Sequence, residues 1–375
     1  MILHLFDDEK VVSRAVGIFE EATPGENFFI VRTKDSCNKQ SLLDLEQKGK
    51  LLIYRDEDEL DPCIFDRITI VSIHYLDVWK INFINKYLPR IDRIRWHVWG
   101  GDMYNDLLVN MGYNIYYEPI YLSDYYRGVI LRFLKKIGYV RPHTRKILDF
   151  IFNRVTELVT TKEEYVIHKQ YLGEKLSSRI IEKPMITYYS IDDMLGKNLV
   201  NKTVTGDNII IGNSSSLSNN HLYVFKILSN LNIGEREILA PLSYGGNLTY
   251  RNHIISCGNT YFKNNFKPLT DFLPLPEYNK VMLGASVCLY GNWRQEAVGN
   301  ILVSLYLGAK VFLSNKSPLL NHYKQMGLFV FCLEEITQDD LDTPLKEDQV
   351  QTNREILYNS CNRNAIIEGI REYLK

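Results

Sequence analysis

The chain has 375 residues and a formal net charge of -1, from 44 basic and 45 acidic side chains. This length exceeds one ordinary hydrophobic core and predicts two domains of roughly 150 to 200 residues each. The hydrophobic fraction of 45% excludes a disordered or collagen-like chain. The near-neutral charge argues against a nucleic-acid-binding protein, so we expect any charged partner to meet a local patch.

Cysteine spacing and the N-terminus limit the protein class further. The six cysteines form no C-x-x-C pair, so we expect neither a disulfide framework nor a zinc site. Acidic residues begin at Asp7, before any apolar stretch of a secretory signal could form. No window reaches the roughly 18 apolar residues that span a bilayer. We expect a soluble protein of a reducing compartment, without a cofactor.

Short apolar runs alternate with segments of helical period, which is typical of parallel sheets covered by helices. In the first half the predicted strands are 2–6, 28–31, 68–71 and 94–99. In the second half they are 209–211, 238–240, 287–290, 311–313 and 328–331. Helices are predicted over 222–231 and 298–306, the latter ended by a left-handed Gly308. The pattern predicts an α/β protein with two Rossmann-like, doubly wound domains facing a central cleft.

Residues 171–207 break this pattern with glycines, a proline and polar clusters, as expected where the chain crosses between domains. We predict an N-terminal domain over 1–180 and a C-terminal domain over 205–345. The remaining residues, 346–375, are predicted to form a last helix that packs back across the hinge.

A serine-rich loop follows the predicted strand 209–211. Gly212, Asn213 and Ser214 begin it and a helix follows, so backbone N–H groups could approach a phosphate. The alternative is a serine-rich helix cap. The Gly-Lys-Ser/Thr of a Walker loop is missing, which favours nucleotide binding without ATPase chemistry.

Two further loops follow strands at the same predicted edge. Residues 241–247 contain Gly245 and Gly246, which allow close backbone approach. Residues 290–300 contain Arg294, whose guanidinium could bind a diphosphate as its charge grows during departure. The alternative for Arg294 is a solvated or ion-paired residue, and three such loops on one edge favour a site.

In the first half, Asp102 follows a predicted strand and two glycines. A carboxylate at this position could face a cleft and act as a base. The alternative is an N-cap of the helix that follows. His4 and Asp8, at the end of the first strand, are expected on the same edge.

A basic and aromatic segment spans 125–148. It contains Arg127, Arg132, Lys135 and Lys136 without an acidic residue between them. Such a segment suits an anionic membrane surface, and a nucleic acid could use the same patch. The alternative is a surface helix pair with solvated charges.

Six segments of the chain together resemble a known family. They are 4–10 (HLFDDEK), 96–104 (WHVWGGDMY), 212–214 with 219–221 (GNS and NNH), 241–245 (PLSYG), 266–274 (FKPLTDFLP) and 294–301 (RQEAVGNI). In this order they resemble the bacterial TDP-N-acetylfucosamine:lipid II N-acetylfucosaminyltransferases, glycosyltransferase family 56, which are similar to GT-B enzymes. Residues 341–375 match none of the family's segments.

The resemblance implies transfer of an amino-deoxy sugar from a nucleotide diphosphate to a lipid-linked glycan of a bacterial surface polysaccharide. This is a cytoplasmic reaction at the inner face of the membrane, with an anionic membrane surface as a partner and no nucleic acid. The GT-B comparison implies a donor site in the C-terminal domain and an acceptor site in the N-terminal domain. The expected acceptor-binding residues are His4, Asp8 and His97. Many retaining GT-B enzymes have two glutamates about eight positions apart in the region that corresponds to Glu296. Here the second position is occupied by Ser304, so the pair is incomplete. The implied donor-binding residues are Gly212, Asn213, Ser214, Asn220, Ser243, Tyr244, Gly245, Gln295, Gly299 and Asn300.

The leading hypothesis is a metal-independent glycosyltransferase in which Asp102 deprotonates the acceptor and Arg294 stabilises the departing diphosphate. Two alternatives remain open. Asp56 and Asp58 form a D-x-D pattern that could bind a metal in a GT-A-like transferase. The chain could also be a non-catalytic module that binds a nucleotide sugar or a glycan.

Overall fold

The computed structural model describes residues 1–8, 11–33, 40–117, 141–196 and 199–374. The chain divides into two compact units. Unit 1 comprises Met1–Tyr113, Leu131–Tyr189 and Arg363–Lys375, and unit 2 comprises Asn114–Ile130 and Ser190–Asn362. The chain therefore passes from unit 1 to unit 2 after Tyr189, and its last residues return to unit 1.

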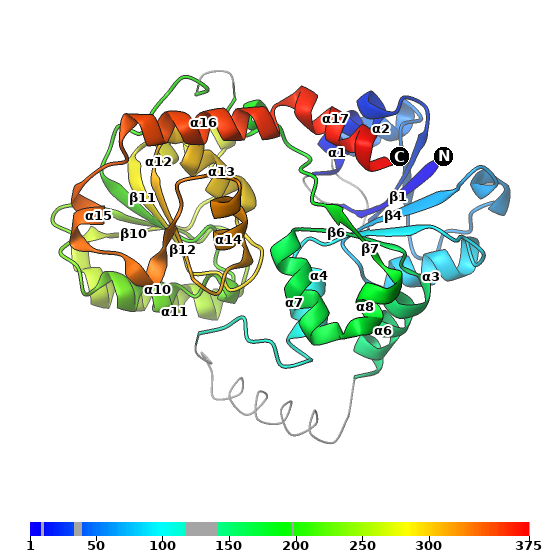
Figure 1. The fold of residues 1–375 in the computed structure, drawn as a ribbon, viewed down its shortest axis with the longest axis horizontal. Helices are drawn as coiled ribbons and strands as arrows, with labels where there is room; N and C mark the ends of the chain where they lie inside the picture. Colours follow the sequence, from blue (N-terminus) through cyan, green and yellow to red (C-terminus); the bar gives the residue numbers. More distant parts are fainter. Residues whose placement is uncertain (9–10, 34–39, 118–140, 197–198, 375) are drawn as a thin grey trace. The chain divides into compact units, whose positions relative to one another are not determined.

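Unit 1 is built on a parallel sheet of seven strands (Figure 1). The strands are β1 (Ile2–Asp7), β2 (Asn27–Arg32), β3 (Leu52–Tyr54), β4 (Ile70–His74), β5 (Ile94–His97), β6 (Glu157–Thr160) and β7 (Ile181–Pro184). They lie in the order β3-β2-β1-β4-β5-β6-β7, so the winding reverses between β1 and β4. The loops after these two strands flank the crevice where open α/β sheets bind ligands.

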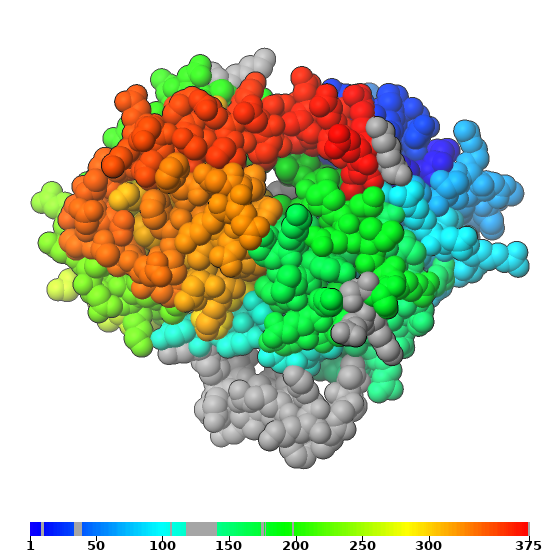
Figure 2. All heavy atoms as spheres, viewed as in Figure 1, coloured from blue at the N-terminus to red at the C-terminus, as the bar shows by residue number. Residues whose placement is uncertain are grey.

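Helices cover both faces of this sheet. They are α1 (Val12–Ala22), α2 (Gln40–Gln47), η1 (Pro62–Phe65), α3 (Val78–Tyr87), α4 (Gly101–Met103), η2 (Tyr104–Leu108), α6 (Pro142–Arg154), α7 (Lys162–Leu172), α8 (Glu174–Arg179) and α17 (Arg363–Leu374). Helices α1 and α17 pack together over one face, where Phe6, Phe19 and Ile370 are fully buried. In the space-filling view α17 (red) lies beside the blue residues of the first helices (Figure 2).

Unit 2 repeats this design with six parallel strands. They are β8 (Asn208–Ile211), β9 (Ile238–Pro241), β10 (Phe266–Leu269), β11 (Ala285–Tyr290), β12 (Lys310–Leu313) and β13 (Phe331–Cys332). The order is β10-β9-β8-β11-β12-β13, so the winding reverses between β8 and β11. The helices are α9 (Ile191–Leu195), η3 (Leu217–Asn219), α10 (His221–Leu228), α11 (Leu248–Phe262), η4 (Lys263–Asn265), α12 (Leu275–Leu283), α13 (Val298–Leu307), α14 (Pro318–Gln325), η5 (Leu333–Glu335), α15 (Gln338–Asp342) and α16 (Glu347–Cys361).

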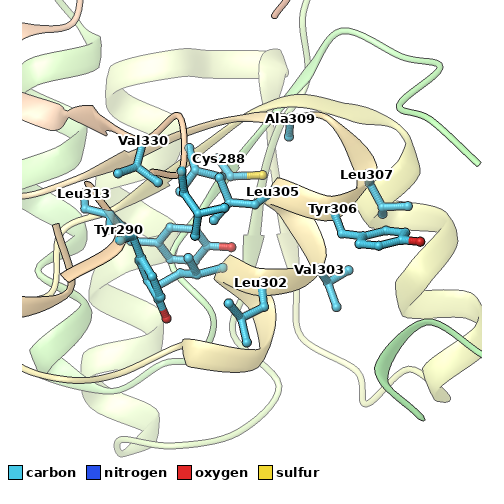
Figure 3. Close-up of a cluster of buried hydrophobic side chains, with 14 of the residues drawn as sticks. Cys288, Tyr290, Leu302, Val303, Leu305, Tyr306, Leu307, Ala309, Leu313 and Val330 are labelled. Atoms are coloured by element: carbon cyan, nitrogen blue, oxygen red, sulfur yellow. The ribbon is translucent and has the colours of Figure 1, made fainter. Parts of the chain in front are cut away.

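The core beneath α13 explains why this helix is so apolar. Its side chains Leu302 and Leu305 pack with Cys288 and Tyr290 of β11 (Figure 3). Helix α16 also packs against α13. Gly308 ends the helix at φ +90°, and a Cβ there would lie 3.0 Å from Val350 of α16. Both the backbone angle and this contact favour glycine.

The structure confirms the two doubly wound α/β domains, and all nine predicted strands are present. Strand β4 begins two residues later than predicted, and β13 covers only the end of its predicted range. Strands β3, β6, β7 and β10 were not predicted as strands. The single helix predicted near the C-terminus is two helices, α16 and α17, with a break at Asn362.

Candidate functional site

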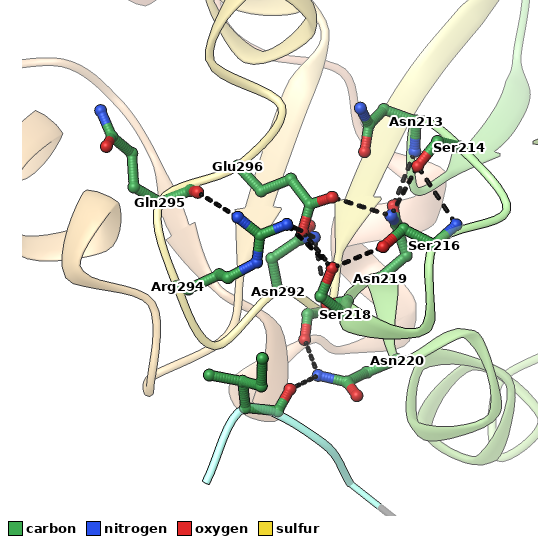
Figure 4. A network of polar contacts seen from close by, with 12 residues as sticks. Asn213, Ser214, Ser216, Ser218, Asn219, Asn220, Asn292, Arg294, Gln295 and Glu296 are labelled. Atoms are coloured by element: carbon green, nitrogen blue, oxygen red, sulfur yellow. Dashed lines mark hydrogen bonds and ion pairs between the residues drawn. The ribbon is translucent and has the colours of Figure 1, made fainter. Parts of the chain in front are cut away.

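The three loops of unit 2 that were predicted to form a phosphate-binding site all lie at the carboxyl edge of its sheet. The loop 212–220 follows β8, 242–247 follows β9 and 291–297 follows β11. Strands β8 and β11 are neighbours at the point where the winding reverses. Polar side chains from the β8 and β11 loops meet there in one network (Figure 4).

The β8 loop folds around the buried side chain of Asn219. Its Oδ1 accepts a hydrogen bond from the Asn213 N–H at 2.9 Å, and its Nδ2 donates to Ser214 Oγ at 3.1 Å. Gly212, at φ +68°, passes so close that a Cβ would lie 2.6 Å from Asn219 Oδ1. Glycine at position 212 therefore allows the loop to close on Asn219.

The β9 loop is bonded to the β8 loop through Ser215. The Ser215 N–H donates to the carbonyl of Tyr244 at 2.7 Å, and its hydroxyl donates to the same oxygen at 2.9 Å. A Cβ on Gly246 would lie 2.0 Å from the Ser215 carbonyl oxygen, and Gly246 has φ +60°. Only glycine fits this close approach of two loops.

The β11 loop supplies a buried ion pair between Arg294 and Glu296. Arg294 Nη2 lies 3.1 Å from Glu296 Oε2 and donates to Ser218 Oγ at 3.2 Å. Glu296 also accepts from Ser218 Oγ at 2.6 Å and from Asn292 Nδ2 at 2.7 Å. Arg294 is only 8% exposed. The guanidinium predicted to bind a diphosphate is therefore paired with a carboxylate and held in one orientation.

Sequence reasoning did not name Glu296, Ser218 or Asn292 as site residues. Glu296 was noted only as half of an incomplete glutamate pair, and the position of the missing partner, Ser304, is buried. Ser304 Oγ lies 3.2 Å from Tyr290 OH and donates to the carbonyl of Asn300 at 2.8 Å. The carboxylate beside an arginine, two positions away in one loop, is the signal that could have indicated the ion pair.

Asn220, predicted to bind the donor, links three segments of the chain. It has φ +50°, and its Nδ2 donates to the carbonyls of Ile115 at 3.1 Å and Gly291 at 2.9 Å. Its Oδ1 accepts from the Tyr117 N–H at 3.0 Å. The Asn220 amide therefore holds the loops together in this structure.

The other predicted donor-binding residues lie around the same loops. Ser243 is half-buried and Tyr244 is 48% exposed. Gly299 and Asn300 belong to the first turn of α13, whose N-cap residue Ala297 provides no side-chain cap. Such a helix end, with its uncapped N–H groups and positive dipole, suits an anion. Gln295 is 6% exposed.

In unit 1, Asp102 is 1% exposed and fully hydrogen-bonded. Its Oδ2 accepts from the indole of Trp96 at 2.7 Å and the N–H of Leu76 at 2.9 Å, and its Oδ1 accepts from the N–H of Trp99 at 3.1 Å. Burial raises the pKa of Asp102 to about 6, although these hydrogen bonds act in the opposite direction. Gly100 is the N-cap of α4, so Asp102 is not the helix cap considered as the alternative.

The structure places His4 and His97 in the packed face of the sheet. His4 is fully buried and lies 3.1 Å from both His74 Nε2 and Asn27 Oδ1. His97 Nε2 lies 2.9 Å from the hydroxyl of Tyr373 on α17. Burial lowers the pKa of His4 to about 3 and holds that of His97 well below its ordinary value. Asp8 is half-buried, and its N–H donates to the Arg32 carbonyl.

A charged cluster that sequence reasoning missed lies where the winding of unit 1 reverses. Asp7 ends β1 and accepts hydrogen bonds from Arg32 Nη2 at 2.9 Å, Trp79 Nε1 at 3.0 Å and the fully buried Lys80. Burial alone would raise the pKa of Asp7, but Lys80 and Arg32 lower it below its ordinary value. Asp77 completes the cluster, 3.6 Å from Arg32.

The residues of the metal alternative lie on a turn after β3. Asp58 accepts from the Arg55 N–H at 2.7 Å, and Asp56 lies 3.7 Å from Arg32 and is 69% exposed. The membrane residues Arg127, Arg132, Lys135 and Lys136 lie outside the described residues. Among the described residues, no helix is long and apolar enough to cross a membrane.

The fold matches that of solved glycosyltransferases, although no protein-family model matches the chain. A glycosyltransferase from Rickettsia africae has a TM-score of 0.62 and 12% identity over 100% of this chain and 98% of its own. HepE of Anabaena, in complex with UDP and glucose, has a TM-score of 0.60 and 11% identity over 100% and 99%. Sucrose-phosphate synthase of Thermosynechococcus elongatus has 0.62 and 11% over 99% and 98%. The chain therefore has the two-domain GT-B fold of these glycosyltransferases.

Proposed function

We propose that the chain is a glycosyltransferase that uses a nucleotide diphosphate sugar as its donor, with the donor bound by unit 2. The observation that carries this proposal is the network of Arg294, Glu296 and Ser218 at the point where the winding of the sheet reverses. Ligands of open α/β sheets bind at this point. The solved relatives support a nucleotide sugar, since HepE binds UDP and UDP-glucose at its own site.

The chemistry requires a group that stabilises the departing diphosphate. In the proposed reaction an acceptor hydroxyl forms a bond to the anomeric carbon, the bond from that carbon to the diphosphate breaks, and the hydroxyl proton passes to a base. Arg294, the Ser214 N–H and the first turn of α13 stabilise the negative charge, whereas the N–H groups of Gly212 and Asn213 already donate to the Leu289 carbonyl and to Asn219 Oδ1. Because Glu296 and Ser218 hold the guanidinium in advance, little reorganisation is needed as the charge develops.

The sugar, the acceptor and the membrane partner rest on the family resemblance. We propose a TDP-N-acetylfucosamine-like donor and a lipid-linked oligosaccharide of enterobacterial common antigen, O-antigen or capsule synthesis. The protein would then work at the inner face of the cytoplasmic membrane. The basic segment with Arg127, Arg132, Lys135 and Lys136 would contact the anionic lipid surface.

Asp102 is the proposed base. A pKa near 6 suits a group that accepts a proton at neutral pH. To act, the carboxylate has to exchange one of its present donors for the acceptor hydroxyl. In Asp102→Asn one carboxylate oxygen becomes an amide NH2 group, which cannot accept the hydrogen bonds that this oxygen accepts now. The variant could therefore lose activity by unfolding, so its activity is measured together with its unfolding free energy.

The test is release of nucleoside diphosphate from UDP-, dTDP- and GDP-sugars, measured with a lipid-linked acceptor and EDTA present. We expect acceptor-dependent release that EDTA does not abolish. Turnover that requires a divalent metal would favour a metal-dependent transferase using Asp56 and Asp58. Donor binding without turnover, for every donor and acceptor combination, would favour the non-catalytic module.

A further inference from the structure

The loop after β12 lies beside the β11 loop at the carboxyl edge of unit 2. Strands β11 and β12 are parallel neighbours, with Tyr290 opposite Leu313. The Ser314 N–H donates to the Tyr290 carbonyl at 3.1 Å, which joins the first residue of the β12 loop to the last residue of β11. The loop 314–317 therefore borders the proposed diphosphate site, although sequence reasoning did not include it.

Lys316 in this loop rests on the ring of Trp293, the residue before Arg294. Its Nζ lies 3.5 Å from the ring centroid, and the lysine is exposed whereas Trp293 is only 3% exposed. Among the described residues, no carboxylate lies within 4.0 Å of Lys316 Nζ. A lysine over a tryptophan face is held weakly in an exposed position. The ammonium is therefore available to a stronger anionic partner.

The carboxylate of Glu334 holds the backbone of the loop beside Lys316. Glu334 accepts hydrogen bonds from Ser314 Oγ at 2.7 Å and from the Asn315 N–H at 2.8 Å. It also accepts from Tyr223 OH at 2.6 Å, and the Tyr223 ring packs edge-on against Trp293. Glu334 therefore holds the backbone beside Lys316 directly, and it positions the Trp293 ring through Tyr223.

The charges of the four loops show why a second cation is needed. The loops 212–220 and 242–247 contain no charged side chain, and 291–297 contains one arginine and one glutamate, which pair with each other. Their sum is zero. Lys316 is the one charged residue of 314–317, so it is the uncompensated charge of the four loops. A nucleoside diphosphate carries more than one negative charge, which a neutral ion pair alone does not balance.

We infer that Lys316 is the second cation of the diphosphate site, and that its ammonium moves from the Trp293 ring to the phosphate farther from the nucleoside. This inference rests on the proposed function, because it assumes a nucleoside diphosphate at this edge. Arg294 would contact the same phosphate, on which the charge grows as the diphosphate departs, and the first turn of α13 would hold the phosphate nearer the nucleoside. Lys316 would then distinguish a nucleoside diphosphate from a monophosphate.

The test compares the affinities of UDP, dTDP and UMP by titration calorimetry. Lys316→Met keeps an apolar stem over Trp293 and removes the charge. We expect it to weaken UDP and dTDP binding about tenfold, the loss of roughly one charge-assisted contact, and to change UMP binding about threefold or less. Lys316→Arg should restore most of the affinity. Lys324→Met, an exposed lysine in the last turn of α14, is the matched control and should bind all three nucleotides normally.

A second measurement follows the ring itself. Trp293 is the one tryptophan between residues 190 and 362, so nucleotide-dependent emission changes in unit 2 report on it. We expect UDP, but not UMP, to change the emission as the ammonium leaves the ring, and Trp293→Phe to abolish the change. Suppose that the parent binds UDP, and that Lys316→Met either binds UDP with the same affinity or loses affinity for UDP and UMP to the same extent. The inference is then wrong while the proposed function stands. If the parent binds neither UDP nor dTDP, the proposed function fails and the inference fails with it.

Discussion

Arg294 was expected to bind a departing diphosphate, with a solvated or ion-paired residue as the alternative, and the structure gives it a carboxylate partner and 8% exposure. A buried arginine that is already paired is more specific than a free one, because its planar fork has a fixed direction. The carboxylate also cancels its charge in the absence of a ligand. At the scale of single residues, the site is therefore organised before any donor arrives.

We predict that Arg294→Ala lowers turnover about 100- to 1000-fold while weakening binding of the intact donor much less. The charge that Arg294 meets grows as the diphosphate departs, so its contribution is larger in the transition state than in the ground state. The measurement is kcat and KM with a saturating donor. Arg251→Ala on α11 is the control. A variant with near-normal kcat would make Arg294 a structural loop residue.

His168 of α7 is fully buried, and neither ring nitrogen has a hydrogen-bond partner among the described residues. Burial lowers its pKa to about 3 from an ordinary value of 6.5. Between these two pH values the unfolded chain binds a proton that the folded chain does not. Stability is therefore lost as the pH falls, by about 2 kcal/mol from this one histidine at pH 5.

We predict that His168→Leu is at least as stable as the parent at pH 7, since it removes two unsatisfied polar atoms. Its loss of unfolding free energy between pH 7 and pH 5 should be about 2 kcal/mol smaller than that of the parent. Urea unfolding at the two pH values measures this difference. His143→Leu, at an exposed position of α6, is the matched control for the loss of one histidine. The same change of stability in both variants would contradict the account.

At the scale of elements, the donor loops depend on glycines that let two backbones approach. Gly246→Ala would place a Cβ 2.0 Å from the Ser215 carbonyl oxygen, so the β8 and β9 loops would have to separate. Gly234 has the same φ of +60°, but its nearest neighbour would be a flexible Arg236 atom at 3.8 Å. The two glycines therefore share backbone strain and differ only in the contact.

We predict that Gly246→Ala weakens UDP binding about tenfold or more, whereas Gly234→Ala costs only the left-handed strain, about 1 kcal/mol of stability, and leaves binding unchanged. Calorimetry with UDP, together with a urea unfolding curve for each variant, separates the two effects. Equal affinities for the two variants would mean that the close approach of the loops is not needed for nucleotide binding.

Helix α17 returns to unit 1 and closes its core. Ile370 is fully buried against α1, and the hydroxyl of Tyr373 lies 2.9 Å from His97. We predict that Ile370→Ala lowers the unfolding free energy of unit 1 by about 2–5 kcal/mol. Tryptophan fluorescence measures this, because Trp79, Trp96 and Trp99 all lie in unit 1. Glu368→Ala, on the exposed side of α17, should change it by less than about 0.5 kcal/mol.

At the scale of the whole molecule, the sequence predicted the two doubly wound domains because their central strands are continuous apolar runs. It missed β6 and β7, which are short and carry charged or proline residues. Glu157 of β6 is buried only because Arg93 and Arg95 pair with it, which strand periodicity does not reveal. Strand β7 lies at the edge of the sheet, where less burial is needed and the apolar signal is weak, whereas β6 lies inside the sheet.

The candidate site was predictable to a similar degree. Loops after strands were assigned to one edge of the sheet because parallel strands bring their carboxyl ends together. His4 was expected at such an edge and His97 in the acceptor site, but both lie within strands, where side chains face the packed layers. The partners of Arg294 and the position of Lys316 depend on contacts between loops, and one sequence does not contain those distances.

The central claim is that unit 2 binds a nucleoside diphosphate at the loops after β8, β9 and β11. Amide hydrogen–deuterium exchange of the full chain, with and without UDP or dTDP at about 100 times the dissociation constant, tests it most directly. The account predicts slower exchange in 212–220, 242–247 and 291–300, and unchanged exchange in 56–58 and 98–104. Bound nucleotide that protects segments of unit 1 and leaves these three loops unchanged would contradict it.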